Sequence, residues 1–490
     1  MLRLKDALGR EVVANIVNGR SVSLPESRTF SVRSAVTGEA VHYAQSATVE
    51  VAKDAVQAAV QAFSSWKRTS VTERRNIINR AADILERRLD DVVERETKET
   101  SCTEHWAKHD AGLATVLMRE TAMNIAGICG SIPPPISPDV TSLLFKEPIG
   151  AVLIIPPWNA ALILSLRGVS TAIGAGCTVI LKASELCPWT HQLILEIFTE
   201  AGLPPGVINQ IQADRADAVA VTEALIADPG IKKIEFIGSA GVGKVIAGLG
   251  AKYLKPVLME CGDQSPCIIL DDADLEQAAT LCAQGALAHS GQLCWSTERI
   301  LVQSKVKDRF LEFLVAAFKA FQHTGCCITE RGAQHTKTIL EAAVADGARF
   351  LVGDAELTGK TALKASLVAD INKSSRLATE EVFGPTASVY IVDNDADAIS
   401  EANRTSFGLS AAVFTADYRR GLKMARELEF GQVQINAMTI YASAAAPVTG
   451  LKSSGWGSNG GPYGIEEFLF IKHVSLHDAP RVMANGAPAS

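Results

Sequence analysis

The segment Ala151-Val152-Leu153-Ile154-Ile155 is the first of three short apolar runs that decide the fold of this chain. Thr178-Val179-Ile180-Leu181 and Lys233-Ile234-Glu235-Phe236-Ile237 come next, each after a stretch with helical spacing. Continuous apolar runs of this length are typical of strands that are buried on both faces of a parallel sheet. The sequence therefore predicts a doubly wound α/β unit, and ligands bind such sheets at the carboxyl ends of the strands.

A second alternating block begins at Cys267-Ile268-Ile269-Leu270 and extends to about Asn436, which predicts a second α/β unit. Within it, Asp271 or Asp272 is well placed to cap a helix over residues 275–289.

The ends of the chain have a different character. The first 130 residues are expected to be largely helical, with one helix over 46–66 and a long charged helix over 70–99. The four prolines within 131–141 indicate a projecting loop or hairpin. Residues 468–474 are predicted to form a strand, and a mobile tail is expected after it.

Composition limits the classes of protein that this chain can be. Its 490 residues, 47% hydrophobic and 21% charged, describe a soluble protein of more than one domain. A net charge of −7 gives no basic footprint for nucleic acid. The longest apolar stretch, 150–166, contains Pro156 and Pro157, so no membrane span is expected. Ten cysteines without a CxxC spacing indicate neither disulfides nor a metal site, which favours the reducing cytoplasm.

Two reactive side chains stand 34 positions apart, Glu260 after an apolar run and Cys294 in Gly291-Gln292-Leu293-Cys294. A cysteine attacks carbonyl carbon as its thiolate, and a nearby carboxylate can activate water. The pair predicts an enzyme that forms a thioester and then hydrolyses it. A lone cysteine is more often a core residue, so the pair needs support from other segments.

A glycine-rich turn, Gly238 to Lys244, follows a strand and opens a helix, where free backbone N–H groups attract phosphate. The bland alternative is a tight turn without a ligand. The turn also nearly matches a phosphate loop of the nucleotide hydrolases. However, Val245 stands where the magnesium-binding Ser or Thr is required, which counts against that class.

Taken together, these segments resemble the aldehyde dehydrogenase superfamily from about Val36 to Lys472. Seven motifs occur in the order of that family: Pro157-Trp158-Asn159, Lys182-Ala183-Ser184-Glu185, Gly202-Leu203-Pro204-Pro205-Gly206, the turn from Phe236 to Gly243, Glu260-Cys261-Gly262, Gly291-Gln292-Leu293-Cys294, and Glu381-Val382-Phe383-Gly384-Pro385. Each motif is modest alone, but seven in order are a strong signal.

The resemblance implies a role for each matching residue. Cys294 is similar to the nucleophile, Glu260 to the base that activates water, and Asn159 to an oxyanion donor beside the Cys294 backbone N–H. The residues implied to hold the cofactor NAD are Trp158, Lys182, Glu185, Gly238, Ser239, Ala240, Gly241, Val242, Gly243, Glu381 and Phe383. Glu185 favours NAD over NADP, because a carboxylate accepts a hydrogen bond from the ribose 2′-OH and repels a 2′-phosphate. NADP stays open as an alternative.

The implied activity is oxidation of an aldehyde to its acid through a cysteine hemithioacetal and a thioester. Two alternatives remain open on the same fold: a relative that passes the acyl group to CoA, against which Glu260 argues, and an inactive scaffold, against which the intact trio of Cys294, Asn159 and Glu260 argues.

A narrower resemblance points to the branch that oxidises aromatic aldehydes such as salicylaldehyde, benzaldehyde and vanillin. Arg167, eight residues after Asn159, is expected near the substrate tunnel, where it either binds a phenolic or carbonyl oxygen or forms a structural ion pair. The side chains expected to line an apolar tunnel are Trp106, Leu293, Trp295 and Tyr441. Asp263, unusual for the family, is expected to place a charge near Glu260 and to shift the pH optimum upward.

The resemblance also implies an α/β fold with three parts. They are a Rossmann-type NAD domain (1–125 and 146–260), an α/β catalytic domain (261–446), and a small β oligomerisation arm with the tail (126–145 and 466–490). Unpaired edges on such an arm would pair with another subunit, so a homodimer or homotetramer is expected.

Overall fold

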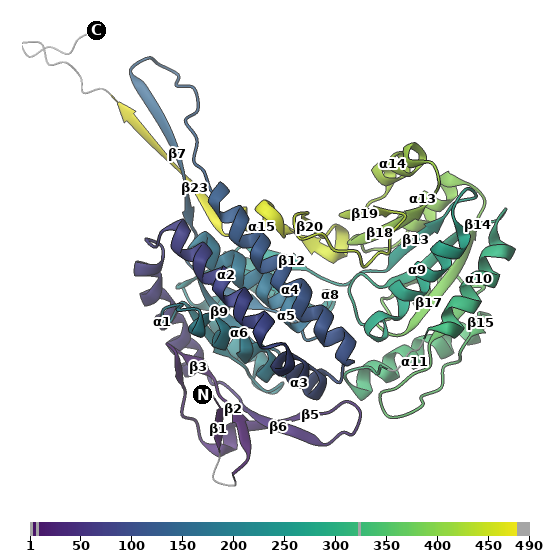
Figure 1. Ribbon diagram of the computed structural model, residues 1–490, viewed down its shortest axis with the longest axis horizontal. Helices are drawn as coiled ribbons and strands as arrows, with labels where there is room; N and C mark the ends of the chain where they lie inside the picture. The colour runs from purple at the N-terminus through teal and green to yellow at the C-terminus, as the bar shows by residue number, and fades with distance from the viewer. Residues whose placement is uncertain (1–2, 6–8, 322–324, 478–490) are drawn as a thin grey trace, which may run out of the picture.

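The structure is a computed structural model that describes residues 3–5, 9–321 and 325–477. It consists of two α/β halves side by side and a two-stranded ribbon that projects from the first half (Figure 1). No helix among these residues is long and apolar enough to cross a membrane.

The first half is built on a sheet of eight strands among the described residues, in the order β21-β12-β11-β8-β9-β10-β3-β4. Its strands are β3 (Ile16–Val17), β4 (Arg20–Ser21), β8 (Ala151–Ile155), β9 (Thr178–Lys182), β10 (Ile208–Ile211), β11 (Ile231–Ile237), β12 (Val257–Glu260) and β21 (Gly455–Trp456). The central strands from β12 to β10 are parallel, so their carboxyl ends share one edge of the sheet. The three apolar runs of the sequence are β8, β9 and β11, which confirms them as strands.

Helices cover both faces of this sheet. One face packs against α2 (Val71–Arg87), α4 (Glu104–Asn124), α5 (Ala161–Ala175) and α6 (Pro188–Glu200), with α3 (Leu89–Thr100) beside them. The other face packs against α1 (Val49–Trp66), α7 (Ala218–Ala227) and α8 (Ala240–Lys252). Burial on both faces explains why apolar residues predominate in β8 and β9, whereas β10 and β11 also carry polar or charged residues.

The second half is built on a sheet with the order β15-β16-β17-β14-β13-β18-β19. Its strands are β13 (Ser265–Ile269), β14 (Thr297–Gln303), β15 (Arg349–Val352), β16 (Ser366–Ala369), β17 (Thr386–Val392), β18 (Ser410–Phe414) and β19 (Gln432–Ile435). The helices around it are α9 (Leu275–Leu287), α10 (Lys307–Ala320), α11 (Glu330–Ala345), α12 (Arg376–Thr379), α13 (Asp395–Asn403) and α14 (Tyr418–Glu427). All neighbours are parallel except β15 with β16.

The projecting ribbon joins two distant segments. β7 (Val140–Pro148) pairs antiparallel with β23 (Leu469–His477) along the whole length of both strands, from Leu469 opposite Pro148 to His477 opposite Val140. The prediction of a strand over 468–474 is confirmed. The mobile tail was expected to begin after residue 474, but 475–477 still belong to β23, and the rest of the tail, 478–490, lies outside the described residues.

The C-terminal segment also returns to the first sheet. It contains β20 (Val448–Thr449), β22 (Ser458–Asn459) and α15 (Gly461–Glu466), and its strand β21 pairs antiparallel with β12. Gly455 has a φ of 113°, and a Cβ there would meet the Met259 carbonyl oxygen at 2.1 Å. Glycine therefore allows the close approach of this segment to β12.

Two predictions for the N-terminal region were wrong. The described residues before position 46 form short strands instead of long helices: β1 (Arg3–Lys5), β2 (Glu11–Val13), β3, β4, β5 (Thr29–Arg33) and β6 (Ala40–Gln45). The expected long helix over 70–99 is two helices, α2 and α3, because Arg88 leaves the helical region with φ −97° and ψ 24°.

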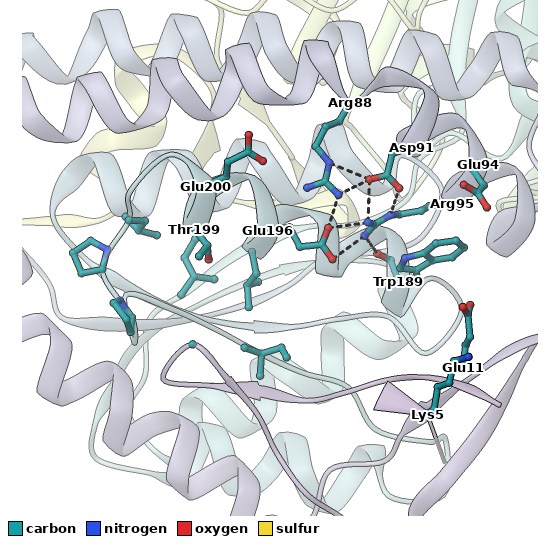
Figure 2. Close-up of a pocket in the computed structure, with 17 residues that line it drawn as sticks. Lys5, Glu11, Arg88, Asp91, Glu94, Arg95, Trp189, Glu196, Thr199 and Glu200 are labelled. Carbon is teal, nitrogen blue, oxygen red and sulfur yellow. Dashed lines mark hydrogen bonds and ion pairs between the residues drawn. The ribbon is translucent and has the colours of Figure 1, made fainter. Parts of the chain in front are cut away.

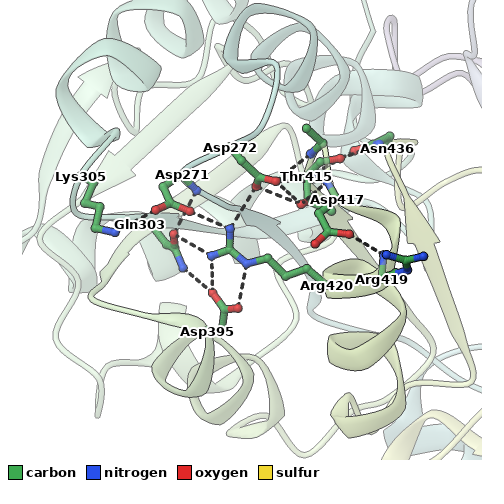
Figure 3. A network of polar contacts seen from close by, with 11 residues as sticks. Asp271, Asp272, Gln303, Lys305, Asp395, Thr415, Asp417, Arg419, Arg420 and Asn436 are labelled. Carbon is green, nitrogen blue, oxygen red and sulfur yellow. Dashed lines mark hydrogen bonds and ion pairs between the residues drawn. The ribbon is translucent and has the colours of Figure 1, made fainter.

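The helix cap in the second half is also different from the prediction. Asp274 caps α9, with its carboxylate accepting the Gln277 N–H at 3.2 Å. Asp271 and Asp272 instead bind the Arg420 guanidinium at 2.7 and 3.1 Å, in the polar network of Figure 3. This network ties α14 to the end of β13, and it lowers the pKa of Asp271 to about 2, first through its bond with Lys305.

Candidate active site

Two cavities meet at the junction between the two halves. One, of about 690 Å³, lies beyond the carboxyl ends of the first sheet, and the other, of about 100 Å³, lies between α4, α5 and the segment 440–448. Asn159 and Cys294 line both cavities. A reagent bound in either cavity can therefore reach the same thiol.

Cys294 stands in a loop between α9 and β14 whose shape is fixed by its backbone. His289, Ser290 and Gly291 have φ of 47°, 59° and 69°, and a Cβ on Gly291 would meet the Gly384 carbonyl oxygen at 2.0 Å. Only glycine fits such a position. The loop thus holds the thiol against the first sheet, with its Sγ 4.0 Å from Glu260 Oε1.

The surroundings of Cys294 disfavour its thiolate. Burial raises the pKa of the thiol well above the ordinary value, and the negative charges of Glu260 and Glu381 add to this effect. At neutral pH the Cys294 thiol therefore keeps its proton. Its S–H donates a hydrogen bond to the Glu260 carboxylate. A positive charge in the neighbouring cavity would lower this pKa.

Glu260 is the last residue of β12, and two other side chains hold its carboxylate. Arg167 Nη2 donates to Oε2 at 2.5 Å, and Asn459 Nδ2 donates to the same oxygen at 3.4 Å. Both members of the ion pair are about 95% buried. Of the two readings of Arg167, the structure shows the ion pair, and its side chain also borders the smaller cavity. Oε1 remains directed at the thiol.

Asn159 follows β8 in the turn that leads to α5. Its Nδ2 donates to the Gln292 carbonyl oxygen at 2.9 Å, which fixes the amide two residues before Cys294. The Gln292 side chain is anchored in turn, donating to the Cys326 carbonyl oxygen at 3.0 Å and accepting the Ile328 N–H. An asparagine amide has a second N–H. That donor is available to an oxygen next to Cys294.

The larger cavity brings together most of the residues that the resemblance implies for the cofactor. Those that line it are Trp158, Lys182, Glu185, Gly238, Ser239, Val242, Glu381 and Phe383. Ser239 caps α8, and its Oγ accepts the Val242 N–H at 3.5 Å, so other N–H groups of the first turn remain open.

Three predicted cofactor residues, Ala240, Gly241 and Gly243, are not among the residues that line this cavity. A Cβ on Gly243 would lie 2.7 Å from the Cys261 sulfur, so this glycine allows α8 to pack on the sheet. Nothing lies within 4 Å of a Cβ on Gly241.

Glu381 and Phe383 close the cavity on the side of the second half. Burial raises the pKa of Glu381 to about 8, although its carboxylate accepts the Asp263 N–H at 3.1 Å. A Cβ on Gly262 would lie 2.1 Å from a Glu381 oxygen, so glycine makes room for this side chain. Phe383 meets Trp158 edge-on, with ring centroids 6.1 Å apart.

The smaller cavity is mainly apolar. Trp106, Leu293 and Trp295 line it as expected, and the Trp106 ring stacks on His289 with 4.6 Å between centroids. Further lining residues were missed because no motif marks them: His109, Leu113, Leu117, Ile163, Leu164, Ile440 and Ser443. Tyr441, also predicted to line the tunnel, is 52% exposed and is not among the residues that line this cavity.

Asp263 has a different place from the one expected. Its buried carboxylate accepts hydrogen bonds from Ser265 Oγ at 2.6 Å and from the Ser410 N–H at 2.9 Å, so it joins β13 to β18. Burial raises its pKa to about 6. Its hydrogen bonds are made to the second half, and Glu260 is not one of the partners.

A still larger hollow, of about 1310 Å³, lies on the far side of α6 near the N-terminal strands (Figure 2). Four of its charged side chains form one network of ion pairs: Glu196 binds Arg88 at 2.5 Å and Arg95 at 2.8 Å, and Asp91 binds Arg95. No cysteine is among its lining residues. Size alone does not mark the reactive site, and the junction at Cys294 is the better candidate.

The fold and the junction define an α/β enzyme with a large cavity at its strand ends and a half-buried thiol beside a carboxylate. Residues 23–474 match the aldehyde dehydrogenase family, and the chain belongs to this family. It is an oxidoreductase that acts on aldehydes.

Known proteins resemble the chain over nearly its whole length. It is 38% identical to a vanillin dehydrogenase of Pseudomonas fluorescens over 475 residues, 95% of this chain and 98% of that protein. The structure of a salicylaldehyde dehydrogenase from Pseudomonas putida G7 with salicylaldehyde superposes with a TM-score of 0.93, at 30% identity over 96% of this chain and 99% of the other. Betaine aldehyde dehydrogenase from Staphylococcus aureus with NAD+ gives 0.91, at 28% identity over 96% of each chain.

Proposed function

We propose that this protein oxidises an aromatic or similarly bulky aldehyde to its carboxylic acid, with NAD as the acceptor and Cys294 as the nucleophile. The observation that carries the proposal is the position of Cys294, which lines both cavities and lies 4.0 Å from Glu260. The mainly apolar lining of the smaller cavity, with Trp106 and Trp295, suits a flat ring. Relatives named for vanillin and salicylaldehyde support the substrate class.

The larger cavity suits NAD by the chemistry of its lining. The open N–H groups at the start of α8 would bind the pyrophosphate, Lys182 and Glu185 the adenine ribose, and Glu381 and Phe383 the nicotinamide side. When bound, NAD would accept the hydride that the aldehyde adduct must lose to become a thioester.

The chain's own groups perform the remaining steps. Cys294 gives its proton to Glu260 and attacks the aldehyde carbon. The second N–H of Asn159 and the Cys294 backbone N–H stabilise the oxyanion by several kcal/mol. Glu260 passes the Cys294 proton to solvent and then takes a proton from water, and the hydroxide oxygen attacks the thioester carbon. The carbon–sulfur bond breaks, the acid is released, and Glu260 returns a proton to the Cys294 sulfur. Arg167 and Asn459 hold the carboxylate that makes this attack possible.

The experiment is to measure NADH formation by purified protein with matched panels of aromatic and aliphatic aldehydes. The proposal expects the highest kcat/KM among benzaldehyde-type substrates. Clearly higher values for short aliphatic aldehydes would contradict the substrate class, and no oxidation of any aldehyde by folded protein that binds NAD would contradict the reaction.

Glu185 is proposed to select NAD over NADP. Replacing Glu185 with Gln removes the charge that repels a 2′-phosphate, so kcat/KM with NADP is expected to rise about tenfold relative to NAD. The measurement is the ratio of the two kcat/KM values. Glu312→Gln, at an exposed site on α10, is the control and should leave the ratio unchanged. An unchanged ratio in Glu185→Gln would remove Glu185 from this role.

We also propose the three-part domain division with its boundaries as given above, and a homodimer or homotetramer built through the ribbon. The ribbon exposes large apolar side chains, with Phe145 at 45%, Ile471 at 64% and Leu476 at 53% exposed. Exposed strands with such side chains favour pairing with another chain. Sedimentation equilibrium should give twice or four times the chain mass, and a monomer at micromolar concentration would contradict the proposal.

A further inference from the structure

A row of charged side chains crosses the buried face of the first sheet beneath α5. Lys233, Glu235 and Ile237 alternate along β11 and therefore point to the same face. Ile237 pairs with Glu260 on the parallel strand β12, so Glu260 points to that face too. A charged row on a sheet face that is otherwise packed with apolar residues needs a physical reason.

Glu235 is the unexplained member of this row. The residue is fully buried, and both of its carboxylate oxygens lack a hydrogen-bond partner. α5 leaves space for it with a glycine, because a Cβ on Gly168 would lie 2.4 Å from Glu235 Oε2. A buried carboxylate without partners is costly, and the proposed chemistry at Cys294 does not use it.

The residue before Gly168 is Arg167, whose Nη2 binds Glu260. The Nε of the same guanidinium is buried and has no hydrogen-bond partner. Arg167 also exerts the largest favourable charge effect on Glu235. The Arg167 guanidinium therefore interacts with two carboxylates, Glu260 at the site and Glu235 deeper under α5.

The other end of the row is neutralised separately. Lys233 is 93% buried at its side chain and binds the carboxylate and the backbone carbonyl of Glu467. Lys233 acts less strongly on Glu235 than Arg167 does. The charged groups around Glu235 are therefore Arg167 from α5, Glu260 from β12, Lys233 from its own strand and Glu467 after α15.

We propose that Glu235 is a positioning residue, a second carboxylate for the Arg167 guanidinium, and that its ionisation loosens the hold of Arg167 on Glu260 during hydrolysis of the thioester. The inference rests on the proposed function. While Glu235 is neutral, Arg167 has Glu260 as its sole charged partner at this site. The ion pair with Arg167 then makes the Glu260 carboxylate a weaker base. Once Glu235 is ionised, Arg167 is shared, and Glu260 is freer to take a proton from water.

Burial raises the pKa of Glu235 to about 7, so this change falls in the working range of pH. The neutral form predominates below that pH and the charged form above it. The hydrolytic step should therefore quicken as pH rises through about 7, and the gain should require a carboxylate at position 235.

The test compares Glu235→Gln with the unaltered protein in two reactions, aldehyde oxidation and hydrolysis of p-nitrophenyl acetate. In the second reaction, Cys294 attacks the ester carbon, nitrophenolate leaves, and water activated by Glu260 hydrolyses the acyl thioester. This ester needs no oxidation step. Failure of the proposed dehydrogenase activity is therefore distinguishable from failure of this inference.

The expected result is that steady-state ester hydrolysis by the unaltered protein rises from about pH 6 to about pH 8, whereas Glu235→Gln stays flat and is about tenfold slower above pH 8. The nitrophenolate burst, which reports attack by Cys294, should keep its amplitude. Superimposed pH profiles, or no turnover in either reaction, would overturn the inference.

Two further variants separate positioning from folding. Glu96→Gln removes another buried carboxylate, whose charged neighbours are Asp110 and Glu99, and should keep the pH profile of the unaltered protein. Gly168→Ala retains Glu235 but pushes its carboxylate away, and should flatten the profile as Glu235→Gln does. Glu235→Gln should melt no lower above pH 7, because the glutamine carries no charge to bury.

Discussion

Replacing Cys294 with Ala should lower steady-state NADH formation by at least about 10⁴-fold, because no other described thiol lines both cavities. The aldehyde carbon then has no nucleophile, so neither the adduct nor the thioester forms. The measurement is absorbance of NADH with saturating NAD and the best aldehyde of the panel.

The matched control is Cys129→Ala, which removes an exposed thiol and should retain full activity. Cys294→Ala should still bind NAD, because the helix start and strand ends of the larger cavity are untouched. Quenching of protein fluorescence measures this binding. Turnover of Cys294→Ala within tenfold of the unaltered protein would exclude Cys294 as the nucleophile.

Replacing Glu260 with Gln should separate the two chemical stages. The first turnover should still give about one equivalent of NADH per active site, because attack by Cys294 and oxidation precede hydrolysis. This burst should be slower than in the unaltered protein, since Cys294 must then give its proton to water instead of to Glu260. Steady-state turnover should then fall by about 10²- to 10⁴-fold, since the amide cannot take a proton from water. Rapid-mixing absorbance measures the burst and the steady rate in one experiment.

The same substitution should also lower thermal stability. Arg167 is about 95% buried and would lose its charged partner, and breaking such a pair from one side costs about 3 kcal/mol or more. A melting curve must therefore show that the variant is folded at the assay temperature. Steady turnover at the unaltered rate in folded Glu260→Gln would exclude Glu260 as the base.

The sequence predicted the features that depend on short stretches. The runs at 151–155, 178–181 and 233–237 are strands because burial on both faces requires unbroken apolar residues. Cys294, Asn159 and Glu260 lie together at the junction of the two halves. Glu260 ends β12, Asn159 follows β8, and Cys294 stands in the loop before β14. Ordered motifs marked all three, and the structure places them within one site.

Features that depend on distant partners could not be predicted. The bond from Arg167 to Glu260 joins positions 93 apart, and nothing local in either segment distinguishes it from a substrate contact. Among the N-terminal strands, β3 pairs with the distant β10, which its own residues do not reveal. The pairs β1 with β2 and β5 with β6 are local, and their short strands were missed. The sequence showed Glu235 simply as part of a predicted strand. The packing of Gly168 against it and the lack of hydrogen-bond partners for its carboxylate appear only in the structure.

The return of the C-terminal segment to the first sheet has a consequence for how this chain is made. The edge strand of that sheet comes from Gly455–Trp456, and the ribbon closes only when Leu469–His477 meets Val140–Pro148. During synthesis, the first half therefore stays incomplete until residues 455–477 have left the ribosome, and the edge of β12 is uncovered until then. Contacts of such long sequence separation slow folding. A nascent chain that stops before Gly455 presents that open edge to chaperones or to aggregation.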